Sequence, residues 1–108
     1  MASQEALLIR VRLSDDDLGS LQDDDLVHAL ENAVEIALAE KHAGYFDGHE
    51  FGEGWVTLFY YGESATQLFE AAVPTLLQLE LRDGSCVVKR YSGPGSREEV
   101  VDLRSGTT

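Results

Sequence analysis

Cysteine and basic side chains are scarce in this chain, and each scarcity excludes a class of protein. The single cysteine, Cys86, leaves no disulfide framework and no paired-cysteine metal site, so we expect it to be a small residue of a sheet. Eight Lys and Arg residues stand against 20 Asp and Glu residues, which gives a formal net charge of −12. Nucleic acid is therefore an unfavourable partner, because phosphate binding needs basic side chains.

Long apolar runs and familiar catalytic motifs are also missing. Polar residues interrupt every apolar run, so we expect neither a membrane span nor a signal peptide, and the cytoplasm is the default compartment. No HExxH motif and no Ser/His/Asp spacing is present. We therefore expect no cofactor and no catalytic residue, and the sequence favours a non-enzymatic role while leaving enzymatic activity open.

The composition nevertheless predicts a folded protein. A chain of 108 residues with 44% hydrophobic residues is long enough to bury one core, and we expect a single domain ordered over about residues 5–103. The acidity is compatible with a basic protein partner. It also has the plainer interpretation that it maintains solubility.

Residues 45–61 predict a β-hairpin. From Trp55 to Tyr61 almost every side chain is β-branched, aromatic or Leu, which is typical of a central strand. Tyr45 to Phe51 contains glycine and acidic residues, as an edge strand protected against mispairing does. The sequence Gly-Glu-Gly at 52–54 suits a short loop with glycine at positive φ.

The N-terminal part predicts a strand and then a helix. Ala6 to Leu13 alternates as a strand, and the aspartate-rich run 14–25 predicts a solvated loop that leads into a helix starting at Asp25. An EF-hand loop is excluded, because Gly19 occupies the fifth position counted from Asp15. The predicted buried stripe of this helix contains Leu26, Ala29, Leu30, Ala33, Ala37 and Leu38, widened by Val34 and Ile36. The predicted polar side contains His28, Glu31, Asn32 and Glu35, and the predicted C-terminus has Lys41 and His42 in its last turn and Gly44 as its stop.

The C-terminal part predicts a second helix and further strands. Ser64 and Gln67 have capping-box spacing, so this helix is expected to begin at Ser64, and Pro74 should kink it or shorten its last turn. Its predicted apolar face contains Leu68, Phe69, Ala72, Val73, Leu76 and Leu77. A turn at 83–84, a strand at 85–91 and an optional strand at 98–103 follow. The order β-α-β-β-α-β predicts a ferredoxin-like α+β sandwich with both helices on one face of an antiparallel sheet.

The segment 44–54, GYFDGHEFGEG, also carries a resemblance. Its G-x-x-D-G-x-E-x-G-x-G spacing, followed by a hydrophobic strand, Tyr61-Gly62 and a helix ending near Pro74, resembles a group of small uncharacterised bacterial proteins. The residues 63–66 depart from the acidic residues and proline that follow the Tyr-Gly pair in that group. The resemblance implies the same fold over about residues 5–103 and no assigned activity.

One face of the predicted sheet is a candidate binding surface. If Leu7, Ile9, Val11 and Leu13 face the helices together with Val56, Leu58 and Tyr60, the opposite face is apolar, aromatic and basic. Such a patch is typical of an interaction surface, either for a protein partner or for a second copy in a two-fold dimer. An RNA-binding platform is disfavoured by the net charge. The candidate residues are Leu8, Arg10, Arg12, Trp55, Phe59 and Tyr61.

A second hypothesis concerns the edge of the predicted hairpin. Asp47 and His49 are two apart and should share a face, Glu50 should point the other way, and His42 ends the preceding helix. These groups predict a weak zinc site or an acid–base site. The alternative is structural, since Asp47-Gly48 is itself a turn dipeptide. Three roles thus stay open: a binding module for a basic partner, a homodimer formed through the sheet face, and a small metal or acid–base site.

Overall fold

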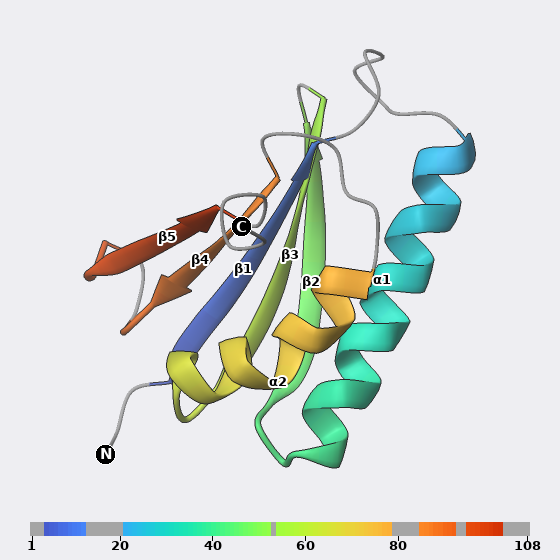
Figure 1. The fold of residues 1–108 in the computed structure, drawn as a ribbon. Coiled ribbons are helices and arrows are strands. Elements are labelled where there is room, and N and C mark those ends of the chain that lie inside the picture. Colours follow the sequence, from blue (N-terminus) through green and yellow to red (C-terminus); the bar gives the residue numbers. More distant parts are fainter. Residues whose placement is uncertain (1–3, 13–20, 53, 79–84, 93–94, 103–108) are drawn as a thin grey trace.

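The computed structural model describes residues 4–12, 21–52, 54–78, 85–92 and 95–102 (Figure 1). These residues form two helices and a five-stranded antiparallel sheet in an α+β arrangement. Neither helix in this described part has the length and hydrophobicity that a membrane crossing needs. The elements are β1 (Glu5–Arg12), α1 (Leu21–Glu40), β2 (Tyr45–Gly52), β3 (Trp55–Gly62), α2 (Ala65–Gln78), β4 (Cys86–Arg90) and β5 (Glu98–Asp102).

The strands lie in the spatial order β2-β3-β1-β4-β5, and every neighbouring pair is antiparallel. The optional last strand of the sequence prediction is present as β5, and β2 is an edge strand as expected. Gly54 has φ of 81° in the β2–β3 loop, which confirms the positive-φ glycine. Leu13, the run 14–20, Glu53 and the turn at 83–84 lie outside the described residues.

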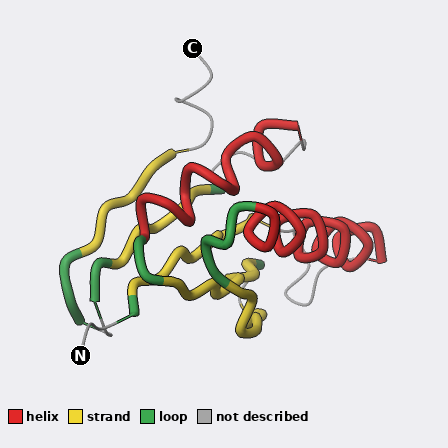
Figure 2. Tube along the Cα trace, turned by 90° about the horizontal axis from the view of Figure 1, so that it is seen from below, coloured by secondary structure: helices red, strands yellow, loops and turns green. Residues whose placement is uncertain are grey.

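Both helices pack on one face of the sheet (Figures 1 and 2). The alternate residues of β1 and β3 that were predicted to face them are fully buried, and Val87 of β4 joins the same core. This result confirms which face of the hairpin points inward. The sheet residues of this core are Leu7, Ile9, Val11, Val56, Leu58, Tyr60 and Val87.

The buried stripe of α1 agrees with the predicted one at Leu30, Val34 and Leu38 and differs from it elsewhere. α1 begins at Leu21 rather than Asp25, and the residues that pack on the sheet are Val27, Leu30, Val34 and Leu38. Ala29 is exposed, Ile36 is 60% exposed, and Glu31, predicted to be on the surface, is only 9% exposed. Small alanines leave the sequence pattern of this helix poorly directional, so the contacts with the sheet decide its rotation.

The C-terminus of α1 also differs from the prediction. The helix ends at Glu40, and His42 rather than Gly44 takes the left-handed conformation, with φ of 52°. The N–H of Ala43 donates to the carbonyl of Leu38 at 2.9 Å, and the N–H of His42 donates to Ala39 at 3.1 Å, which is a Schellman motif. Lys41 and His42 therefore follow the last turn instead of lying in it.

Gly44 and Gly62 are needed where two connections cross. A Cβ added to Gly44 would overlap the carbonyl oxygen of Tyr61, and a Cβ added to Gly62 would overlap the carbonyl oxygen of Ala43. Each glycine thus lets the backbone of the other connection approach closely. The crossing holds the α1–β2 connection against the end of β3.

The start of α2 is capped as the sequence predicted. The Oγ of Ser64 accepts a hydrogen bond from the N–H of Gln67 at 3.2 Å, and the Glu5 carboxylate accepts one from the N–H of Ala65 at 2.7 Å. α2 continues through Pro74 to Gln78. Leu77 is 53% exposed, so its predicted place on the apolar face is wrong.

Candidate functional site

The uncovered face of the sheet brings the predicted partner-binding residues together. In the antiparallel register Arg12 lies opposite Trp55, Leu8 opposite Phe59 and Ala6 opposite Tyr61. Arg10 is exposed, whereas Trp55, Phe59 and Tyr61 are partly exposed. The face therefore combines aromatic and cationic side chains that folding leaves in contact with water.

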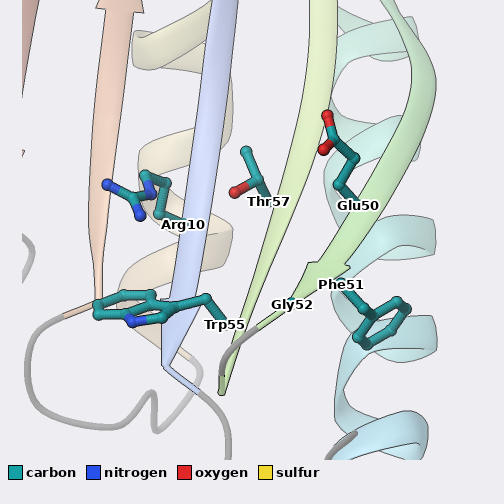
Figure 3. Close-up of a pocket in the computed structure, with 6 residues that line it drawn as sticks. All are labelled: Arg10, Glu50, Phe51, Gly52, Trp55 and Thr57. Carbon is teal, nitrogen blue, oxygen red and sulfur yellow. The ribbon is translucent and has the colours of Figure 1, made fainter. Parts of the chain in front are cut away.

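Trp55 anchors two arginines on this face. The guanidinium carbon of Arg10 lies 5.0 Å from the centre of the Trp55 ring, and that of Arg12 lies 5.3 Å from it. Both distances fall in the range of cation–π attraction. Figure 3 views this face with the helices behind the strands and shows the Trp55 ring next to Arg10. The ring thus restricts where the two positive charges can lie.

Two hollows lie beside the edge strand on this face, where β2 has glycines. One, of about 180 Å³, is lined by Arg10, Glu50, Phe51, Gly52, Trp55 and Thr57. The other, of about 290 Å³, is lined by Asp47, Gly48, His49, Glu50, Phe59 and Tyr61. Gly48 lies opposite Phe59 and Gly52 opposite Trp55, so each glycine leaves space in front of an aromatic residue of β3. The sequence motif contained these glycines, but only the register assigns them to this face.

Arg90 also belongs to the uncovered face, and the sequence did not single it out. It lies opposite Ala6 of β1 and Glu98 of β5 and is only 8% exposed. Its Nε is buried without a hydrogen-bond partner among the described residues. The β1–β4 side of the face is therefore more tightly closed than the β2–β3 side, which carries the hollows.

His49 lies on the opposite, helix-covered side of β2. It is paired with Leu58, and its Nδ1 lies 2.6 Å from a carboxylate oxygen of Glu31 on α1. The rings of Phe46 and Phe51 flank the imidazole, with centroid separations of 6.5 and 5.0 Å. Sequence reasoning missed Glu31 because the helical pattern assigned it to the polar side.

A β-bulge separates Asp47 from the alternation of β2. Phe46 lies opposite Tyr60 and Gly48 opposite Phe59, so Asp47 is an inserted residue. The prediction that Asp47 and His49 share a face rested on unbroken alternation, which this strand does not have. Glu50, opposite Thr57, lies on the uncovered face and so points away from His49, as predicted.

The three residues of the metal hypothesis lie at different structural positions. His42 caps α1, Asp47 is in the bulge, and His49 contacts Glu31. Within the described ranges no group of three or more His, Cys, Asp and Glu side chains is arranged to hold a metal ion. The metal and acid–base role around Asp47 and His49 stays a prediction.

Tyr60 carries a buried hydroxyl on the helix-covered side of the sheet. The residue is fully buried, and the centre of its ring lies 5.2 Å from that of Phe46. Its hydroxyl has no hydrogen-bond partner in the described part of the chain. Burial raises the pKa of Tyr60 well above its ordinary value, and the negative charges of Glu31 and Glu35 raise it further. The phenol therefore stays neutral throughout the physiological range.

Comparisons of the chain with protein-family models, with curated proteins and with solved structures found no match. The function must therefore be argued from the site itself.

Proposed function

We propose that this protein is a non-enzymatic interaction domain that binds through the uncovered face of a ferredoxin-like sheet. The observation that carries the proposal is the grouping of partly exposed aromatic side chains with arginines on the side of the sheet that neither helix covers. Aromatic residues and arginine are the side chains that dominate binding energy at protein interfaces. The strand order β2-β3-β1-β4, extended by β5, supports the ferredoxin-like arrangement.

The charges on this face narrow the class of partner. The chain as a whole has a net charge of −12, yet Arg10 and Arg12 lie beside Trp55, and Glu50 lies on the same face two strands away. A surface with both signs favours a partner that also presents both signs, since like charges placed opposite each other weaken binding. A protein surface meets this requirement better than a polyanion does.

The test compares exposed residues of the sheet face with exposed residues of the helices. Trp55→Ala and Phe59→Ser alter the uncovered face, whereas Ile36→Ser and Leu77→Ser alter exposed helix positions. We expect chemical cross-linking in host lysate to give specific adducts, to itself or to another protein, that only the two face variants lose. Adducts that persist in both face variants, or that the helix variants lose equally, would contradict the proposal.

The alternative is an acid–base or metal site centred on His49. The observation that favours it is the 2.6 Å contact between Nδ1 and the largely buried Glu31 carboxylate, since a paired carboxylate orients an imidazole. Titration of the purified protein with Zn²⁺ tests the metal version. We expect this version to show stoichiometric binding that His49→Ala removes, and equal binding by both proteins would count against it.

A further inference from the structure

We propose that the uncovered face binds a second copy of this chain, related to the first by a two-fold axis that runs parallel to β3 and passes over Thr57. The inference rests on the proposed function and names its partner. The cross-strand rows of side chains on this face, which the register of β2, β3 and β1 fixes, have the composition that such a dimer needs.

Four rows of side chains cross the face from β2 over β3 to β1. In each row a residue of β3 lies in the middle, with its β2 partner on one side and its β1 partner on the other. Figure 3 shows the row formed by Glu50, Thr57 and Arg10. The rows are Tyr45–Tyr61–Ala6, Gly48–Phe59–Leu8, Glu50–Thr57–Arg10 and Gly52–Trp55–Arg12.

A half-turn about an axis along β3 exchanges the two flanks of every row. It lays β1 of one copy over β2 of the other and leaves each row at its own level along the strand. A two-fold interface of this kind is isologous, so each contact occurs twice. Stacked sheets lie roughly 10 Å apart, which leaves room for side chains from both faces to interdigitate.

The central row then becomes complementary in charge. Arg10 of one copy lies over Glu50 of the other, and the symmetry makes the same pair a second time. Both residues are exposed in the single chain, so both are available to a partner. Charged groups paired in this way fix the register of an interface more than they add raw affinity.

Two of the other rows become complementary in size. Leu8 lies over Gly48 and Arg12 over Gly52, so a large side chain meets a glycine in each. In the remaining row Ala6 is fully buried and offers the partner's Tyr45 no contact surface. The hollows of about 180 and 290 Å³ are located at Gly52 and Gly48, where the partner's β1 side chains arrive. The aromatic residues of β3 lie along the axis and stack on their own copies.

The net charge of −12 opposes association of two copies. Salt at about 0.15 M screens charges separated by more than about 8 Å, so the contacts within the face decide the outcome. A highly basic partner would gain from the overall charge but would meet Arg10 and Arg12 at the face. A second copy meets no such repulsion within the face, because Arg10 lies over Glu50. We therefore assign the face to a second copy.

The experiment uses charge reversal at the central row. We expect light scattering with size exclusion to give the wild-type protein twice the 11.9 kDa mass of one chain. Arg10→Glu and Glu50→Arg each place like charges together twice, and each should weaken the dimer by at least about 100-fold. Glu70→Arg changes an exposed acid on α2 and should leave the dimer intact.

Mixing the two single variants separates a direct contact from a defect in folding. In the mixture the introduced glutamate of one copy faces the introduced arginine of the other, and the unchanged Glu50 faces the unchanged Arg10. Opposite charges then meet at both symmetric positions, so we expect a mixed dimer to form from two monomeric variants. The double variant Arg10→Glu/Glu50→Arg should also recover the dimer.

A cysteine on the axis gives an independent readout. Thr57→Cys places one thiol of each copy on the two-fold axis, so we expect it to form an intermolecular disulfide under oxidised glutathione. The wild type, which contains Cys86, is the control and should not form one.

Each other outcome overturns the inference. A wild-type protein that stays monomeric, a dimer that survives both reversals, or a mixture that fails to associate would exclude this arrangement. A monomeric wild type whose face variants still lose cross-links to another protein would leave the proposed function standing. A monomeric wild type whose face variants also keep all their cross-links would contradict the proposed function as well.

Discussion

The two sides of β3 differ in what folding does with their side chains. On one side Val56, Leu58 and Tyr60 have no exposed surface, because α1 and α2 cover them. On the other side Trp55 and Phe59, equally apolar or more so, stay partly exposed. One strand thus contributes alternate residues to the core and to the face that we propose as a binding surface.

Neighbouring residues of β3 contribute different free energies to folding. Burial of a Leu or Val side chain contributes about 1.5–3 kcal/mol to folding. The aromatic residues of the uncovered side realise only part of that gain in the single chain, and a partner that covered them would supply the rest. Substitutions on the two sides of the strand test this division of roles.

Leu58→Ala should be far more costly to the fold than Phe59→Ala. Leu58 is fully buried under the helices, so the truncation should lower the free energy of unfolding by about 3 kcal/mol. Phe59 is partly exposed, and its truncation should cost about 1 kcal/mol in the single chain. Urea denaturation at low protein concentration measures both values, and equal losses would contradict the comparison.

Glycine substitutions should separate the same two sides. Gly62→Ala forces a Cβ against the backbone of Ala43 and should destabilise the protein by about 2 kcal/mol. Gly52→Ala meets nothing within 4 Å, so the unfolding free energy of the single chain should stay nearly unchanged. A stable Gly62→Ala variant, measured by thermal unfolding, would show that the crossing of the two connections relaxes.

Tyr60→Phe should stabilise the covered side. The variant removes a buried hydroxyl that lacks a partner among the described residues, which should gain about 1 kcal/mol at neutral pH. Because burial raises the pKa of Tyr60 in the folded state, this pKa difference costs no stability below the ordinary pKa of 10.0; above it the unfolded chain ionises first and stability falls as pH rises. The wild type should therefore lose stability in alkali more steeply than the variant, with Tyr45→Phe, an exposed tyrosine, as control.

The smallest effect concerns the β4–β5 edge, far from the hairpin. The Glu99 carboxylate accepts hydrogen bonds from Lys89 at 2.9 Å and Tyr91 at 3.0 Å, and these lower the pKa of Glu99. Its contribution is present above the ordinary pKa of 4.5 and is lost as pH falls below it. Glu99→Gln should slightly flatten the acid limb of the unfolding profile, and an unchanged limb would show that this exposed network adds nothing.

Much of the fold could be predicted because β3 has a clear period of two. Its alternation separated two sets of side chains, and the set assumed to face the helices is the one that the structure buries, together with its counterparts in β1. The Ser64 cap and the edge position of β2 were also readable, because they depend on local chemistry. From these features the sequence predicted the candidate face, including Arg10 and Trp55.

The errors arose where tertiary contacts decide the structure. The rotation of α1 depends on how Val27, Leu30 and Val34 meet the sheet, which an alanine-rich helix does not specify. Glu31 is buried because it meets His49 from a strand 18 residues away. The bulge at Asp47 could not be predicted, because the sequence of β2 does not distinguish a bulged strand from a regularly alternating one.

The bulge at Asp47 sets the phase of everything that follows it in β2. Phe46 and His49 are three positions apart, yet both lie opposite buried residues of β3, because Asp47 occupies a position that has no partner of its own. Without this residue, Phe46, Gly48, His49 and Glu50 would meet the same partners in regular alternation. A single-codon deletion at this point would therefore straighten the edge strand and leave its inner and outer surfaces as they are.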